Sequence, residues 1–189
     1  AYTQRSLWQL WNSGDSSPFR STDYQPEAIY IVPVPESLGK LPFGWNLRML
    51  QAGLAHQSNG QSNPLSRSWN RASFGAGLEK DDFSLLLGVS QRLHFQGKDD
   101  NPHIDDYMGR GEVSMAWSPG PSSLSLTWRN NLKSVNRGSL QVDWSHPVFS
   151  GQPNGLRWYV QLFSGYGEML LDYNHRQNSL GLGLSLFQF

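Results

Sequence analysis

Residues 50–78 read LQAGLAHQSNGQSNPLSRSWNRASFGAGL, two runs of alternating apolar residues on either side of a polar segment. Side chains on a strand alternate between its two faces, so the apolar residues of the first run share a face with His56 and Ser58. The segment 59–65 contains Asn-Gly and Asn-Pro, which favour a chain reversal. The sequence therefore predicts an antiparallel hairpin in which Asn70, on the apolar face of the second run, lies beside His56.

The same period of two recurs along the chain in about ten segments of strand length. One face of each segment is apolar, as in residues 83–89 and 180–186, and the other face is polar. Charged residues on the polar faces are Arg92, Arg110, Glu112, Arg129, Asp143 and Arg157. Long polar loops are predicted at residues 12–25, 95–106 and 165–178, and short turns at 79–82 and 118–122.

Composition narrows the class of protein. The chain has 189 residues, fifteen Lys and Arg against fifteen Asp and Glu, and no cysteine. The formal charge of zero gives no electrostatic basis for binding nucleic acid, and the lack of cysteine excludes disulfides and a thiol nucleophile. The sequence has no run of about 18 apolar residues, so only strands are available to cross a bilayer. We expect a single domain over residues 1–189.

Two architectures fit the alternating strands: a soluble sandwich with apolar faces inside, and a membrane barrel with those faces toward lipid. Aromatic residues near strand ends on the apolar faces are typical of an interfacial girdle, and charged residues on the other faces would pair inside a lumen. The aromatic residues in question are Trp117, Trp128, Trp144 and Trp158. The sequence therefore favours an all-β, antiparallel transmembrane barrel. Since long loops face the exterior in such barrels, His56, Ser58 and Asn70 are expected at the outer rim on the lipid side.

Three polar side chains of the predicted hairpin have the chemistry of a hydrolytic site. The Ser58 hydroxyl becomes a nucleophile if the His56 imidazole takes its proton, and the Asn70 side-chain oxygen can accept from the imidazole N–H to orient the ring. A calcium ion would add positive charge, and suitable oxygen ligands come from Asn63, Ser66 and nearby carbonyls. The spacing His-x-Ser is also found at solvated strand ends, so the pattern alone leaves both interpretations open.

A longer set of motifs resembles one family. His56-Gln57-Ser58-Asn59-Gly60 followed by Ser66-Arg67-Ser68-Trp69-Asn70-Arg71 is similar to the active-site signature of outer membrane phospholipase A. Further matching segments occur in order at residues 2–4, 8–10, 16–20, 99–102, 107–109, 164–168 and 172–174. The resemblance implies a twelve-stranded barrel in the bacterial outer membrane that hydrolyses phospholipid acyl esters, depends on calcium and is active as a homodimer.

The resemblance also implies roles for single residues. His56 would be the base, Ser58 the nucleophile, Asn70 the residue that orients His56, and Gly60 the backbone donor to the oxyanion. Calcium would be held by the carbonyl of Gln61, the hydroxyl of Ser66 and Ser16 of the partner subunit. A second calcium site would include Asn63 and Asp100. The family commonly has an aspartate in place of Asn63, so one charge is lost there. Gln4 would lie at the dimer interface, and activity would depend on dimerisation.

Other readings stay open at this point. The chain begins after an N-terminal region of the family that holds about two strands, so we expect ten strands rather than twelve. Two alternative functions are a passive outer-membrane pore and an acyl hydrolase acting on lipopolysaccharide. The acidic pairs Asp99-Asp100 and Asp105-Asp106 are interpreted as exposed loop charges.

Overall fold

The computed structural model describes residues 1–9, 14, 19–94, 99, 101–152 and 155–186. Ten antiparallel strands form one sheet in which each strand pairs with its neighbours in sequence. The strands are β1 (Tyr2–Trp8), β2 (Phe19–Pro33), β3 (Asn46–Ser58), β4 (Ser68–Lys80), β5 (Phe83–Leu93), β6 (Gly111–Trp117), β7 (Ser123–Asn130), β8 (Gly138–Pro147), β9 (Arg157–Gly165) and β10 (Gln177–Ser185). Short helices α1 (Glu36–Gly39) and η1 (Pro42–Gly44) join β2 to β3, and α2 (Ile104–Met108) precedes β6. The predicted all-β antiparallel class and the count of ten strands are confirmed.

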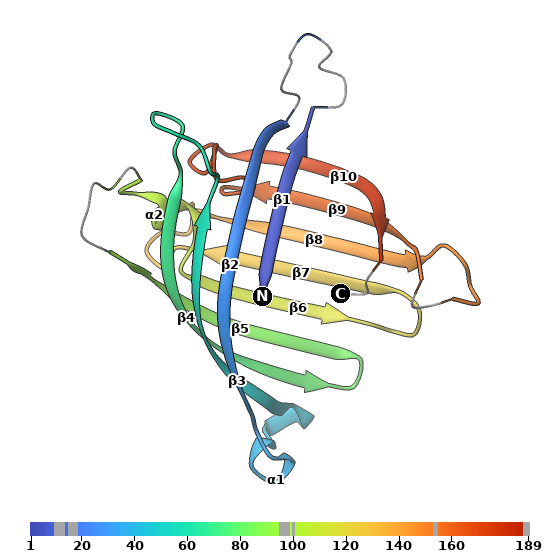
Figure 1. Cartoon of the computed structure of the whole chain (residues 1–189). Coiled ribbons are helices and arrows are strands. Elements are labelled where there is room, and N and C mark those ends of the chain that lie inside the picture. Colours follow the sequence, from blue (N-terminus) through green and yellow to red (C-terminus); the bar gives the residue numbers. More distant parts are fainter. Residues whose placement is uncertain (10–13, 15–18, 95–98, 100, 153–154, 187–189) are drawn as a thin grey trace.

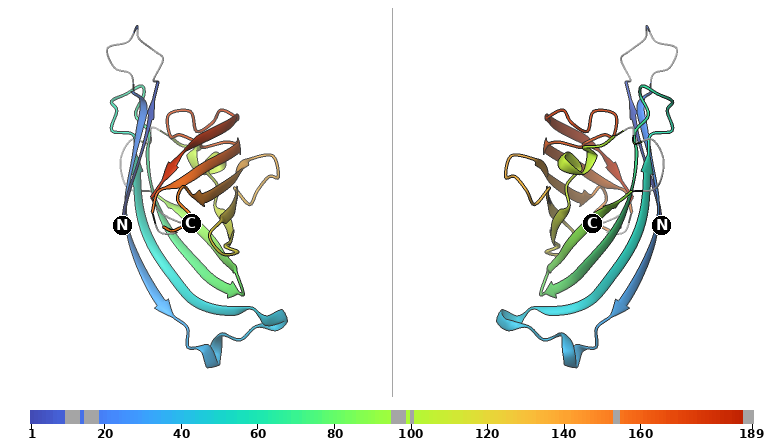
Figure 2. Two further views of the ribbon diagram at one scale, coloured as in Figure 1. Left: turned by 90° about the vertical axis from the view of Figure 1, so that its right-hand side faces the viewer. Right: turned by 90° about the vertical axis from the view of Figure 1, so that its left-hand side faces the viewer.

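The sheet curls until its two ends approach each other. Figures 1 and 2 show β1–β4 as one wall and β6–β10 as the wall that faces it. Glu168, in the connection between β9 and β10, links the ends of the strand order: its carboxylate accepts hydrogen bonds from Ser179 on β10 at 2.6 Å and from Arg5 on β1 at 3.4 Å. Arg5 also donates to the Glu168 carbonyl at 2.8 Å. The sheet is therefore a barrel wall around a lumen.

The wall is apolar outside and polar inside. Leu54, Phe74 and Trp158 are 54–58% exposed, whereas Asp143 is 6% exposed and Arg157 is fully buried. Buried polar groups need hydrogen-bond partners, and these have them. The Asp143 carboxylate, for example, accepts from the side-chain amides of two neighbouring lumen residues at 2.9 and 3.0 Å. In water this distribution would be unstable, so it supports the barrel and not the soluble sandwich. In the described part of the chain, no helix is long and apolar enough to cross a membrane.

One loop prediction is wrong. Residues 12–25 were expected to be a polar loop, but β2 begins at Phe19. Ser21 and Asp23 are buried on the lumen side of β2, and the Ser21 hydroxyl donates to the Asp23 carboxylate at 3.2 Å. The inner face of a membrane barrel carries polar residues, so this part of the strand has the composition of a loop. At its other end β2 stops at Pro33, which lacks the N–H needed to continue the ladder.

The outer end of the lumen is filled by a plug, made of α2 and the connection between β9 and β10. Its apolar part is a buried cluster of Trp69, Ile104, Leu170 and Tyr173, with Tyr107 and Met108 packed against it. Figure 1 shows α2 beside the ends of β3 and β4 that lead to their shared loop. Trp69 of β4 therefore connects the wall to the plug.

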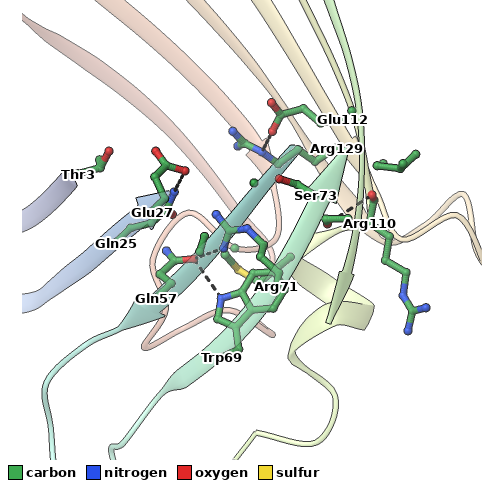
Figure 3. Close-up of a pocket in the computed structure, with 18 of the residues that line it drawn as sticks. Thr3, Gln25, Glu27, Gln57, Trp69, Arg71, Ser73, Arg110, Glu112 and Arg129 are labelled. Carbon is green, nitrogen blue, oxygen red and sulfur yellow. Dashed lines mark hydrogen bonds and ion pairs between the residues drawn. The ribbon is translucent and has the colours of Figure 1, made fainter. Parts of the chain in front are cut away.

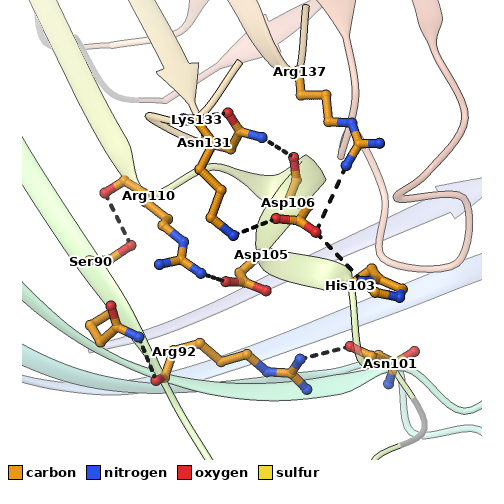
Figure 4. A network of polar contacts seen from close by, with 11 residues as sticks. Ser90, Arg92, Asn101, His103, Asp105, Asp106, Arg110, Asn131, Lys133 and Arg137 are labelled. Carbon is orange, nitrogen blue, oxygen red and sulfur yellow. Dashed lines mark hydrogen bonds and ion pairs between the residues drawn. The ribbon is translucent and has the colours of Figure 1, made fainter.

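The interpretation of Asp105 and Asp106 as exposed charges is also wrong. Asp105 is 6% exposed and pairs with Arg110, and Asp106 pairs with Lys133 at 2.9 Å (Figure 4). Asp99 in the preceding loop pairs with the buried Arg92 at 2.7 Å. The pairs of Asp105 and Asp106 connect α2 to the residue that precedes β6 and to the connection between β7 and β8. These pairs do not follow from the alternating pattern, because their partners lie on other strands and connections.

Candidate active site

The predicted hairpin is formed by β3 and β4. Their ladder pairs His56 with Asn70 and Leu54 with Ala72, so all four side chains share one face of the sheet. Leu54 is 58% exposed on that face. Since the exposed apolar face is the outer one, His56 and Asn70 lie outside the lumen at the end of the hairpin near the loop 59–67.

His56 and Asn70 are hydrogen bonded. The distance from His56 Nδ1 to Asn70 Oδ1 is 2.8 Å. An amide oxygen only accepts, so this pairing requires the proton on Nδ1 and leaves Nε2 as the basic nitrogen. That is the tautomer a serine hydrolase needs, with the orienting group on one ring nitrogen and the nucleophile's proton received by the other.

Ser58 is the last residue of β3, two positions after His56. Its neighbours in the sheet are Tyr24 on β2 and Ser68 on β4, and its side chain is partly buried. Within the described ranges, the Ser58 hydroxyl makes no hydrogen bond to the His56 ring. Such contacts are often long without substrate and tighten when it binds. Ser58 therefore lies on the same face of the sheet as His56, two residues further along β3.

The loop between β3 and β4 is organised by Asn59, whose side chain is 4% exposed. Its amide donates to the Leu65 carbonyl at 2.9 Å, and its oxygen accepts from the backbone N–H of Gln61 at 3.3 Å and of Arg67 at 2.9 Å. The alternating pattern did not predict a role for Asn59. An asparagine at the first position of a turn commonly bonds through its side chain to the backbone two residues on. That pattern is the sequence signal by which the role of Asn59 could have been predicted.

Gly60 follows with φ at +65°, a conformation that glycine adopts without strain. A Cβ at this position would lie 3.3 Å from the ring of Tyr24 on β2. Both the backbone conformation and the close ring therefore favour glycine here. Gly60 directly follows Ser58-Asn59 in the loop.

The candidate calcium ligands in the described residues are Gln61, Asn63 and Ser66, all in this loop. They offer oxygen donors without charge, a set that suits a hard cation such as calcium. Across the described ranges, no group of three or more histidine, aspartate or glutamate side chains is placed to hold a metal ion. Two other candidates, Ser16 and Asp100, lie outside the described residues. An ion at this loop would thus be held by neutral oxygens and would need ligands from elsewhere.

A separate cavity of about 460 Å³ lies on the lumen side of the hairpin (Figure 3). Its polar lining residues include Gln57, Arg71 and the ion pair between Arg129 and Glu112 at 2.7 Å. His56, Ser58 and Asn70 belong to the opposite face of the same strands. The candidate site therefore opens toward the exterior of the barrel, not into its cavity.

A barrel wall that is apolar outside and polar inside, with a hydrogen-bonded His-Asn pair on its outer face, defines the class of protein as a membrane β-barrel. Comparison with known proteins agrees. The family model for phospholipase A1 matches residues 1–186. The chain belongs to the phospholipase A1 family.

Individual relatives match over nearly the whole chain. A relative from Neisseria meningitidis is 45% identical across 97% of this chain, and the chain spans about half of that relative, 47%. The solved outer membrane phospholipase of Salmonella typhi, a dimer with bound calcium, has a TM-score of 0.83 and 36% identity over 97% of this chain and 67% of that one. Outer membrane phospholipase A from Escherichia coli gives a TM-score of 0.84 at 35% identity, over 97% of this chain and 72% of that one.

Proposed function

We propose that this protein hydrolyses acyl esters of phospholipids in the bacterial outer membrane, with Ser58 as nucleophile, His56 as base and Asn70 as the residue that orients it. The observation that carries the proposal is the 2.8 Å hydrogen bond between His56 and Asn70 on the lipid-facing side of the wall. A hydrolytic group in that position meets its substrate within the membrane. Membership of the phospholipase A1 family supports the same substrate class.

The reaction runs in two halves. Ser58 Oγ attacks the ester carbonyl carbon while its proton passes to His56 Nε2, and Asn70 holds the ring by accepting from Nδ1–H. The tetrahedral intermediate collapses, the ester C–O bond breaks, and His56 returns the proton to the lysophospholipid oxygen that leaves. A water molecule then attacks the acyl-serine with His56 again as base, and the fatty acid is released from Ser58.

The oxyanion of each tetrahedral intermediate needs a fixed donor. The Gly60 N–H fits this role because a positive φ and the Asn59 hydrogen bonds hold the backbone rigid beside Ser58. Asn70 is neutral and stabilises an imidazolium less than a carboxylate would. Additional positive charge near the oxyanion would therefore increase the rate.

We further propose that calcium supplies this charge, held by the carbonyl of Gln61 and the hydroxyl of Ser66, with Ser16 of the partner subunit completing the set. The calcium-bound dimer of the Salmonella relative supports this. Gln4 on β1 is exposed at one end of the strand order, where its amide bonds to Tyr2 at 3.1 Å and to Ser6 at 3.4 Å. A second subunit packed against this face would give the amide a further partner. The second calcium site, with Asn63 and Asp100, would hold one carboxylate fewer than in the family, because Asn63 contributes no charge.

Release of fatty acid from phospholipid micelles, with calcium and with a chelator, tests the reaction. We expect calcium-dependent release that is lost in Ser58→Ala and His56→Ala. Activity in Ser58→Ala would overturn the assignment of the nucleophile. A passive pore would release no fatty acid from any lipid, and a lipopolysaccharide hydrolase would act on lipopolysaccharide and not on phospholipid.

Dimerisation is tested separately with cross-linked subunits. Covalent dimers are expected to hydrolyse faster than free subunits at the same calcium concentration. Equal activity in subunits held as monomers would contradict the sharing of calcium ligands between subunits.

A further inference from the structure

The lumen face of the catalytic hairpin carries a hydrogen-bonded group that the proposed reaction does not use. Gln57 Oε1 accepts from Trp69 Nε1 at 3.0 Å and from Arg71 Nη1 at 3.1 Å (Figure 3). The Arg71 guanidinium lies 4.8 Å from the centre of a Trp69 ring. A single oxygen on β3 is therefore bonded to two successive lumen-facing residues of β4. We call Gln57, Trp69 and Arg71 the lumen brace.

The lumen brace alternates in sequence with the catalytic pair. Gln57 directly follows His56, and Asn70 lies between Trp69 and Arg71. The ladder pairs Gln57 with Trp69 just as it pairs His56 with Asn70. Because two donors converge on one acceptor, any shift of β3 along β4 would break at least one of these bonds. The brace therefore fixes, from inside, which residue of β4 lies opposite His56 outside.

The brace is itself anchored in the plug. Trp69 is 5% exposed and belongs to the buried cluster with Ile104, Leu170 and Tyr173. Its indole N–H is thus bonded to Gln57, the Arg71 guanidinium lies over its ring, and the side chain is buried with the plug residues. This packing fixes the position of the Trp69 side chain. A backbone hydrogen bond of the ladder near the end of a strand would not fix that side chain.

We propose that Gln57 is a positioning residue for the active site: through Trp69 and Arg71 it holds His56 in line with Asn70 across the hairpin. The inference rests on the proposed function. A displacement of about 1 Å in a reacting group can lower a rate by about 100-fold. Loss of the shared acceptor should therefore reduce kcat and leave KM, which depends on lipid contacts on the outer face, nearly unchanged.

The test compares matched variants of the full chain in detergent micelles. Gln57→Met keeps the length of the side chain and removes the acceptor, and we expect kcat to fall about 10- to 100-fold with KM within about twofold. Gln57→Glu keeps an oxygen in place and should restore kcat to within about threefold of the unmodified protein. Gln51→Met is the control, since Gln51 faces the lumen from the same strand, about 20 Å away, opposite Gly75.

Two results would overturn the proposal: a kcat for Gln57→Met within about twofold of the unmodified protein, or equal losses in Gln57→Met, Gln57→Glu and Gln51→Met. If Gln57→Met fails to fold, Trp69→Phe removes one donor and keeps an aromatic ring, and an unchanged kcat there has the same meaning. Ser58→Ala separates the two claims. If Ser58→Ala is active, the proposed function fails; if it is inactive while Gln57→Met is fully active, only the positioning role fails.

Discussion

Asn59→Ala is expected to disorder the loop that carries Gly60, Gln61 and Ser66 while leaving the barrel folded. The substitution removes three hydrogen bonds from one buried side chain. At about 1 kcal/mol net each, the loss is about 3 kcal/mol, equivalent to roughly a 100-fold shift from the ordered toward the disordered loop. The strand ladder of β3 and β4 is untouched, so the thermal midpoint of the barrel should barely change.

The assay is the initial rate of fatty-acid release over a calcium titration. Asn59→Ala should lower the maximal rate by about 10- to 100-fold and raise the calcium concentration for half-maximal rate. Asn59→Asp keeps the oxygen that accepts from Gln61 and Arg67 and loses the donor to Leu65, so a smaller effect is expected. Ser62→Ala, at an exposed position of the same loop, is the control. Wild-type calcium dependence in Asn59→Ala would refute the idea that this side chain shapes the loop.

Three further predictions concern the site and the plug. Asn70→Ala should lower kcat about 10- to 100-fold by freeing the His56 ring, and Asn70→Asp should retain much more activity in the same assay. Gly60→Ala should lower kcat because the positive φ costs a residue with a Cβ about 1–2 kcal/mol and the methyl meets Tyr24; a wild-type rate would contradict the backbone role. The hydrogen bond from Lys133, followed by its charge, lowers the pKa of Asp106 below the ordinary 3.8. Its stabilisation is therefore present above that value and lost as pH falls through the lowered pKa, and Asp106→Asn should flatten this decline in thermal midpoint below about pH 4.

The sequence predicted most of the wall, because its outer face alternates without interruption over long runs. From Leu50 to Ser58 the expected and observed strands coincide. β3 in fact begins earlier, at Asn46. That start was not predicted, because a register shift between Leu47 and Met49 breaks the alternation. The start of β2 was missed because lumen-facing Ser21 and Asp23 resemble loop residues. Where the residues of a strand that face the lumen are polar and its outward residues are not clearly apolar, hydrophobic periodicity does not predict the strand.

For the candidate site, the hairpin alone predicted the contact between His56 and Asn70, because a short loop fixes which residues meet. Asn59 and Gln57 were not found. Their partners are backbone groups of the loop in one case and side chains on the far face of β4 in the other, and neither follows from alternation. The plug was missed for a similar reason, since Asp106 meets Lys133 from 27 positions away.

The outward orientation of His56 also determines how this protein would encounter substrate. A catalytic side chain that faces hydrocarbon meets lipids by lateral diffusion, so the relevant concentration is molecules per unit area of interface. Adding inert detergent at constant total phospholipid should then slow hydrolysis by spreading the substrate over more interface, even though its bulk concentration does not change.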